Sequence, residues 1–164
     1  MTGEGWTRCV VALGTNMGER EDIAFHALAD IRAIEGFAVV ADSSLHETVA
    51  LTKEGFDPLA PPYVNQVILM DSAWSPEKTL SKLFEVEHRH GRVRGAERYA
   101  PRTLDLDLIK YGDLVLVSEN LTLPHPRAHE RRFVLAPWLE IEEGAELPGF
   151  GRVSTLLERI PEDT

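Results

Sequence analysis

The sequence contains a single cysteine, Cys9, so no disulfide bond can form within its 164 residues. This fits a reducing compartment, and we expect a cytoplasmic protein. Because Cys9 lies in an apolar run, we interpret it as a small core residue rather than a nucleophile. The chain has no apolar run long enough to cross a bilayer. Residues 1–6 lack the basic region and apolar segment of a signal peptide.

Basic residues are also scarce. Lys and Arg number 17 against 27 Asp and Glu, for a net charge of −10. This balance argues against nucleic-acid binding, which usually needs a basic face. The arginines are unevenly placed, since eight of the thirteen lie between Arg89 and Arg132. A local arginine cluster in an acidic protein indicates a compact polyanionic ligand.

The length and a hydrophobic content of 43 % suit one domain over residues 1–164. Apolar periodicity and turn residues predict strands and helices in the order β-α-β-β-α-β, an α+β class with ferredoxin-like topology. A Gly112-Asp113 hairpin, a further edge strand and a C-terminal extension of two short helices follow. Two long loops, 48–62 and 91–101, interrupt the pattern, and loops of this length are often functional. The predicted strands cover 8–13, 37–47, 63–70, 104–111, 114–117 and 121–123, and the predicted helices cover 20–34, 76–90, 133–139 and 153–160.

Asp105 and Asp107 lie in the segment Arg102–Ile109, which leads into and forms most of the predicted strand 104–111. Because side chains alternate along a strand, the two carboxylates share one face, while Leu104, Leu106 and Leu108 share the other. Their carboxylates would be roughly 6.5 Å apart, and the repulsion between them would be relieved by one or two hard divalent cations. The alternative is a solvated strand face.

Five arginines precede or begin this strand, at positions 89, 92, 94, 98 and 102. Carboxylates that hold metal beside arginines that hold anions suit phosphoryl transfer. The alternative is a surface patch paired with Glu87 and Glu97, which would contribute little. Glu87 lies on the apolar stripe of its helix, so it either snorkels to solvent or orients an arginine.

Two further sites leave alternatives open. Tyr63 and Asn65 point to one face of their strand, either as a core pair or as a flat aromatic and an amide that recognise a heterocycle. His125 lies between two prolines, where packing and contact with a phosphate are equally compatible with the sequence.

Together these residues resemble the 6-hydroxymethyl-7,8-dihydropterin pyrophosphokinase family of folate biosynthesis, over nearly the whole chain. The most specific match is Gly91-Arg92-Val93-Arg94 followed by the segment from Arg98 to Asp107. Supporting matches are Leu13–Gly18, Tyr63-Val64-Asn65, and Leu123–Pro126 with Arg131 and Phe133 beyond.

The resemblance implies a monomer that uses ATP and two Mg²⁺ ions to move a pyrophosphoryl group onto the hydroxymethyl oxygen of the pterin, releasing AMP. Asp105 and Asp107 would bind the metals, and with Arg92 and Arg102 they would form the catalytic set. The remaining roles also follow from the resemblance. ATP would be bound by Glu87, Arg92, Arg94, Arg102, Leu108, His125 and Arg131, and the pterin by Thr48, Leu51, Tyr63, Asn65, Tyr99, Asp105 and Phe133.

The sequence departs from the family pattern in three places. Tyr99 stands where tryptophan is frequent, Val49-Ala50 follow Thr48 where prolines are frequent, and Thr15 replaces a usual serine. Two other functions remain possible: a ferredoxin-like module that binds a small ligand without catalysis, and a two-metal nucleotidyl transferase that releases pyrophosphate. We expect the protein to act on small-molecule substrates, and we expect neither a nucleic acid nor a membrane as a partner.

Overall fold

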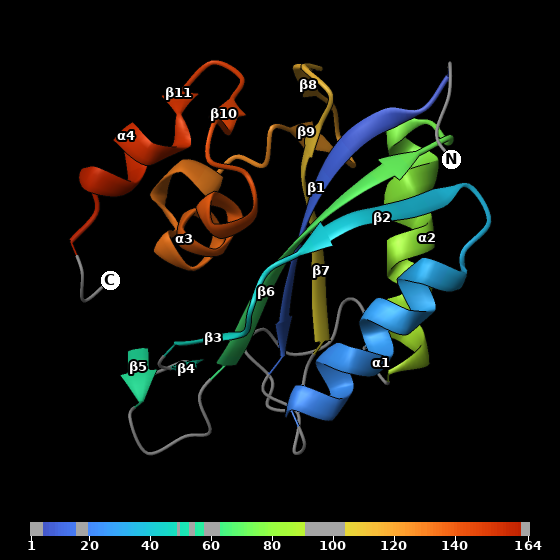
Figure 1. Ribbon diagram of the computed structural model, residues 1–164, viewed down its shortest axis with the longest axis horizontal. Coiled ribbons are helices and arrows are strands. Elements are labelled where there is room, and N and C mark those ends of the chain that lie inside the picture. The colour runs from blue at the N-terminus through green and yellow to red at the C-terminus, as the bar shows by residue number, and fades with distance from the viewer. Residues whose placement is uncertain are drawn as a thin grey trace.

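The computed structural model describes residues 5–15, 20–48, 50–52, 55–57, 63–90 and 104–161. A sheet runs through the middle of the molecule, with α1 and α2 on one side and α3 and α4 on the other (Figure 1). The strands of this sheet are β1 (Thr7–Thr15), β2 (Phe37–Asp42), β3 (His46–Thr48), β6 (Tyr63–Ser72) and β7 (Leu104–Tyr111). The α-helices are α1 (Arg20–Ala33), α2 (Pro76–Arg89), α3 (Arg132–Ile141) and α4 (Val153–Glu158), and a short 3₁₀ helix, η1, covers Ala128–Glu130.

The sheet order is β2-β6-β1-β7, with β3 continuing alongside β6. In this order β1 lies between β6 and β7. Every pairing in the sheet is antiparallel. The register aligns four residues from four strands in one row, because His46 pairs with Asn65, Asn65 with Gly14, and Gly14 with Asp105. In this row only β1 separates the predicted metal-binding strand, β7, from Asn65 on β6.

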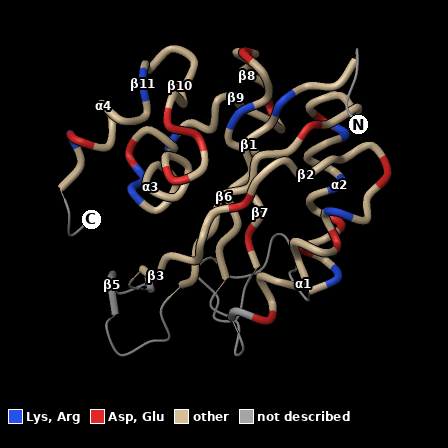
Figure 2. Tube along the Cα trace, in the orientation of Figure 1, with Lys and Arg blue, Asp and Glu red and all other residues tan. Residues whose placement is uncertain are grey.

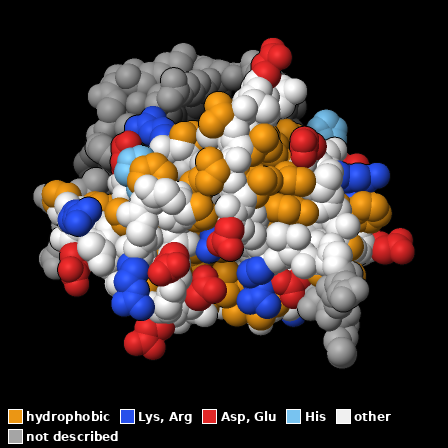
Figure 3. Space-filling view, turned by 90° about the horizontal axis from the view of Figure 1, so that it is seen from above, with side chains coloured by type: hydrophobic (Ala, Val, Ile, Leu, Met, Phe, Trp, Pro, Cys, Tyr) orange, Lys and Arg blue, Asp and Glu red, His pale blue; other side chains and the backbone are white. Residues whose placement is uncertain are grey.

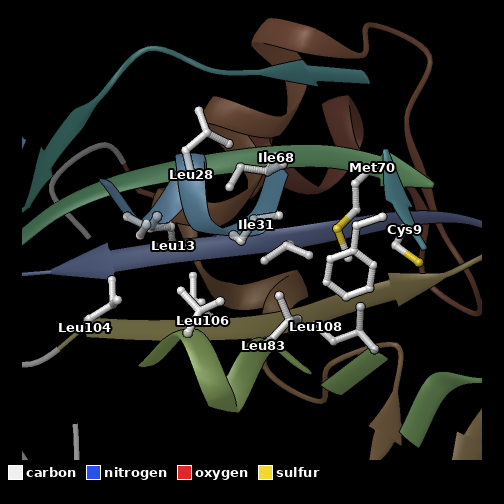
Figure 4. Close-up of a cluster of buried hydrophobic side chains, with 14 of the residues drawn as sticks. Cys9, Leu13, Leu28, Ile31, Ile68, Met70, Leu83, Leu104, Leu106 and Leu108 are labelled. Atoms are coloured by element: carbon white, nitrogen blue, oxygen red, sulfur yellow. The ribbon is translucent and has the colours of Figure 1, made fainter. Parts of the chain in front are cut away.

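A hydrophobic core lies between the sheet and the helices α1 and α2. Leu104, Leu106 and Leu108 are at most 2 % exposed there and pack with Leu13 and Leu83 (Figure 4). The prediction that these three leucines share one face is therefore confirmed. Because they are anchored on this side, Asp105 and Asp107 must point to the opposite face.

A second core lies under α3. Trp138 and Leu135 are fully buried against Val67 and Ile109, together with Val10 and residues of α4. Ala12, which pairs with Asp107, is among the partly buried residues at the border of this core. Helix α3 thus packs on the face of the sheet that carries the two aspartates. Its first turn begins next to Asp107.

Most predicted elements are observed. Helix α1 covers the expected segment, and α2 begins as predicted, with the Ser75 hydroxyl accepting from the Lys78 N–H at 3.1 Å. The predicted strand 37–47 is instead divided into β2 and β3 by residues 43–45. Part of the predicted loop 48–62 is a small hairpin of β4 (Ala50–Thr52) and β5 (Gly55–Asp57).

The predicted hairpin at Gly112-Asp113 is wrong. The segment that follows it does not pair with β7: β8 (Leu116–Val117) pairs with β9 (Thr122–Leu123), so the chain reverses at residues 118–121. There the Ser118 hydroxyl donates to the Leu121 carbonyl at 2.8 Å and stabilises the turn. Another two-stranded ribbon, β10 (Glu146–Leu147) and β11 (Gly151–Arg152), joins α3 to α4.

Charged side chains of both signs are interspersed on the face that Figure 3 shows, and the described part of that face carries no extended basic surface. Every helix in the described ranges is too short or too polar to span a bilayer.

Candidate active site

Asp105 and Asp107 lie side by side on β7, at partly exposed positions, and the acidic residues of this strand are red in Figure 2. Their partners on β1 are small, since Asp105 pairs with Gly14 and Asp107 with Ala12. A Cβ atom at Gly14 would lie 3.3 Å from Oδ1 of Asn65. Gly14 therefore keeps space open between the carboxylate of β7 and the amide of β6.

Arg131 brings a positive charge to this face. It occupies the N-cap of α3, and its Nη1 lies 4.0 Å from Oδ2 of Asp107. The guanidinium carbon is 5.5 Å from the ring centre of Phe133, a cation–π distance. The start of α3 thus places a guanidinium next to the carboxylate of Asp107 and an aromatic ring next to the guanidinium.

His125 is held at the same end of the sheet. Its backbone N–H donates to the Ile109 carbonyl at 2.9 Å, and its Nδ1 accepts from the Arg127 N–H at 3.2 Å. Burial lowers the pKa of His125, and the Arg131 and Arg127 charges lower it further, against an opposing effect of Asp107. The lowered pKa favours the neutral ring, and since Nδ1 accepts from the Arg127 N–H, Nε2 is the nitrogen left to carry the proton. A donor of this kind suits a phosphate oxygen.

Thr48, Tyr63 and Asn65 come together where β3 joins β6, because Thr48 pairs with Tyr63. Asn65 is 5 % exposed, and its Nδ2 donates to Oγ1 of Thr48 at 2.9 Å and to the His46 carbonyl at 3.3 Å. Both amide hydrogens therefore have acceptors on β3, which fixes the orientation of the amide. Its Oδ1 lies on the Gly14 side, in the row that ends at Asp105.

Glu87 occupies an unexpected position. It is 1 % exposed, so the snorkelling hypothesis is wrong. Its Oε2 accepts from the backbone N–H of Leu106 at 2.7 Å. Leu106 is the residue between the two aspartates, and β7 is the edge strand of the sheet that the described residues form. Glu87 therefore satisfies a backbone N–H that has no strand partner in that sheet.

A sequence model of the family described as 7,8-dihydro-6-hydroxymethylpterin-pyrophosphokinase (HPPK) matches residues 10–143. The chain belongs to this family. A 2-amino-4-hydroxy-6-hydroxymethyldihydropteridine pyrophosphokinase of Synechocystis sp. is 38 % identical over 152 residues, which cover 92 % of this chain and 75 % of the relative. The Haemophilus influenzae protein of the same name is 33 % identical over 150 residues, covering 92 % of this chain and 91 % of that protein.

Solved structures agree with the HPPK fold. A Plasmodium falciparum HPPK-DHPS structure with pteroate matches with a TM-score of 0.71 and 11 % identity, over 96 % of this chain. This chain spans 43 % of that solved chain. The resemblance identified from the sequence motifs is thus confirmed at the level of the family, and the mixed α+β class at the level of the fold.

The carboxylates of Asp105 and Asp107 have the chemistry of ligands for a hard divalent cation such as Mg²⁺. Among the described residues no group of three or more His, Cys, Asp and Glu side chains could hold a metal ion alone. Mg²⁺ is usually bound by one or two carboxylates together with substrate phosphates and water, so Asp105 and Asp107 are the protein ligands expected for such a site.

Some predicted site residues cannot be compared with the structure. Arg92, Arg94, Tyr99 and Arg102 lie outside the described residues, and of Leu51 only the backbone, in β4, is described. Leu108 is 2 % exposed in the α1/α2 core, so its side chain serves packing. Its contact with ATP, like that of Glu87, stays a prediction.

Sequence reasoning missed Glu140. Its carboxylate accepts from the backbone N–H and the hydroxyl of Ser44, at 2.6 and 2.7 Å, and its Oε1 lies 3.0 Å from Nε2 of His46. These residues are more than ninety positions apart in the sequence, and no local pattern links them. The available signal was the hydroxyl-rich Ser43-Ser44 pair at the point where the second strand is interrupted.

Proposed function

We propose that this protein transfers the β,γ-pyrophosphoryl group of ATP to the hydroxymethyl oxygen of 6-hydroxymethyl-7,8-dihydropterin and releases AMP, a step of folate biosynthesis. The observation that carries the proposal is the row from β7 to β3. In this row only Gly14 of β1 lies between Asp105 and the fixed amide of Asn65, and Arg131 lies next to Asp107, two residues further along β7. The two ends of this row suit the two substrates of an HPPK.

We infer that Asp105 and Asp107 hold two Mg²⁺ ions across the triphosphate. The bound metal would neutralise charge on the transferred and departing oxygens. Arg131 and His125 would add a guanidinium and an Nε2–H donor, and the 4.0 Å separation of Arg131 from Asp107 supports this role. Arg92, Arg94 and Arg102 are proposed to contribute further positive charge, and Glu87 and Leu108 to border ATP.

The pterin is proposed to lie between β6 and the start of α3. Asn65 would recognise its polar edge, with Tyr63 and Phe133 along its flat faces and Thr48, Leu51 and Tyr99 around it. The Asn65 Oδ1, oriented by β3, supplies an acceptor for a ring N–H. Asp105 would lie close enough to contact the hydroxymethyl group that reacts.

Catalysis on this proposal rests on positioning and charge neutralisation, because the nucleophile is a neutral alcohol and the transferred group is highly anionic. Either aspartate could accept the alcohol proton. The antiparallel order supports a ferredoxin-like arrangement, and we propose active-site loops at 48–62 and 91–101. We also infer a single domain that acts as a monomer in the cytoplasm.

Substitution of the two carboxylates tests this assignment. Asp105→Ala and Asp107→Ala should each lower turnover by at least roughly 100-fold, about 3 kcal/mol of transition-state stabilisation, with the fold retained. Asp113→Ala, at an exposed position just beyond β7, is the matched control and should keep wild-type activity. Near-wild-type turnover in either folded site variant would refute the metal assignment.

A further inference from the structure

Hydrogen bonds of Glu140 connect α3 to the segment between β2 and β3 and to the first residue of β3. It lies near the C-terminal end of α3, and its carboxylate engages Ser44 through two hydrogen bonds and His46 through a third. The pKa of Glu140 is lowered to about 2 by the Ser44 N–H first, then by the Ser44 hydroxyl and His46. All three donors thus favour the ionised carboxylate.

The segment that Glu140 contacts continues directly into the residues of β3 that orient Asn65. His46 is the first residue of β3, and its carbonyl accepts from Nδ2 of Asn65. Thr48, two residues later, accepts from the same nitrogen through its hydroxyl. β3 is three residues long and pairs only with β6 in the described sheet, so its position depends on restraints at its ends.

We propose that Glu140 is a positioning residue for the acceptor substrate: it fixes β3 through Ser44 and His46, and β3 in turn fixes the Asn65 amide that recognises a flat heterocycle. This inference rests on the proposed function, since it assumes that Asn65 contacts the pterin. Glu140 lies outside the proposed pterin slot. It would influence specificity through the contacts that link Ser44, His46, Thr48 and Asn65.

The role is separable from folding. The Glu140 side chain is 38 % exposed and that of His46 34 %. Water can therefore replace the carboxylate as an acceptor when it is removed, and a large loss of stability is not expected. Ser43 supplies a second, independent anchor, because its hydroxyl accepts from the Val67 N–H at 3.0 Å. The loss should be confined to the position of residues 44–48.

The test compares Glu140→Ala and Glu140→Gln with Glu143→Ala, an exposed carboxylate just beyond the same helix. Pterin binding is measured by calorimetry with Mg²⁺ and a saturating non-hydrolysable ATP analogue, on variants that circular dichroism shows to be folded. We expect Glu140→Ala to raise the pterin Kd about tenfold, equivalent to about 1.4 kcal/mol, while the Kd of the ATP analogue changes less than about twofold. Glu140→Gln keeps one acceptor oxygen for Ser44 and should give an intermediate Kd.

A second readout follows the backbone directly. Amide hydrogen exchange of residues 44–48 should be faster in Glu140→Ala than in the wild type, and unchanged in Glu143→Ala. Equal pterin affinity in the Glu140 and Glu143 variants, or parallel losses of pterin and ATP-analogue affinity, would overturn the positioning role while leaving the proposed function intact. Failure of the wild type itself to bind the pterin would overturn both.

Discussion

Replacing Glu87 by alanine should weaken both the fold and the catalytic strand. The change removes the acceptor of the Leu106 N–H, and a buried donor left without a partner costs about 1–3 kcal/mol. Two carbons are also lost from a position that is 1 % exposed. We expect a net loss of about 2 kcal/mol, which for a chain of this size lowers Tm by roughly 4–8 °C.

The same change should lower kcat, because Leu106 separates Asp105 from Asp107. Displacement of reacting groups by about 1 Å can cost roughly 100-fold in rate, so partial release of this strand should cost about tenfold. Glu87→Gln keeps an acceptor oxygen and nearly the same volume, and should recover more than half of both losses. Glu85→Ala, on the exposed side of α2, is the control.

The assays are thermal unfolding followed by circular dichroism, and steady-state kinetics at a temperature well below the lowest Tm. Wild-type Tm and kcat in Glu87→Ala would show that the Leu106 hydrogen bond contributes nothing. A raised KM for ATP with unchanged Tm and kcat would instead indicate that Glu87 serves ATP binding, as the sequence resemblance implies.

Three further outcomes are expected. Arg131→Ala should lower kcat by about tenfold or more with a smaller effect on the pterin Kd, because a guanidinium suits charge on phosphoryl oxygens; loss of pterin affinity alone would contradict this role. Gly14→Val should weaken pterin binding with little change in the ATP-analogue Kd, since its side chain would crowd Oδ1 of Asn65, and calorimetry would expose an error if both affinities were unchanged. Burial raises the pKa of the fully buried Cys9 to about 12, so the side chain is a neutral thiol at pH 8; a thiol reagent at that pH should label it in denaturant but not in the native protein, and rapid native labelling would refute its burial.

Local pattern was sufficient for most of the elements and for part of the site. Strict alternation over Leu104–Leu108 predicted which face carries Asp105 and Asp107, and Ser75-Pro76 predicted the start of α2. The same alternation predicted that Tyr63 and Asn65 point to one face. Such signals are contained within a few neighbouring residues, so periodicity and capping rules can read them.

Contacts between distant segments could not be predicted in this way. The Glu87–Leu106 bond depends on how α2 packs over the sheet edge, and the Glu140–Ser44 bonds depend on α3 lying against the β2–β3 junction. The hairpin at Gly112-Asp113 failed for a related reason, since turn residues mark a reversal without specifying which strands pair. The role of Gly14 required the register of three strands together.

The most direct test of the central claim is the identity of the nucleotide product. Purified protein is incubated with ATP, Mg²⁺ and 6-hydroxymethyl-7,8-dihydropterin, and the mixture is resolved by anion-exchange chromatography. The account predicts AMP and a diphosphorylated pterin in equal amounts, with neither formed when Mg²⁺ or the pterin is omitted. ADP with a monophosphorylated pterin, pyrophosphate with an adenylylated pterin, or no turnover would each contradict it, the last in favour of a binding module.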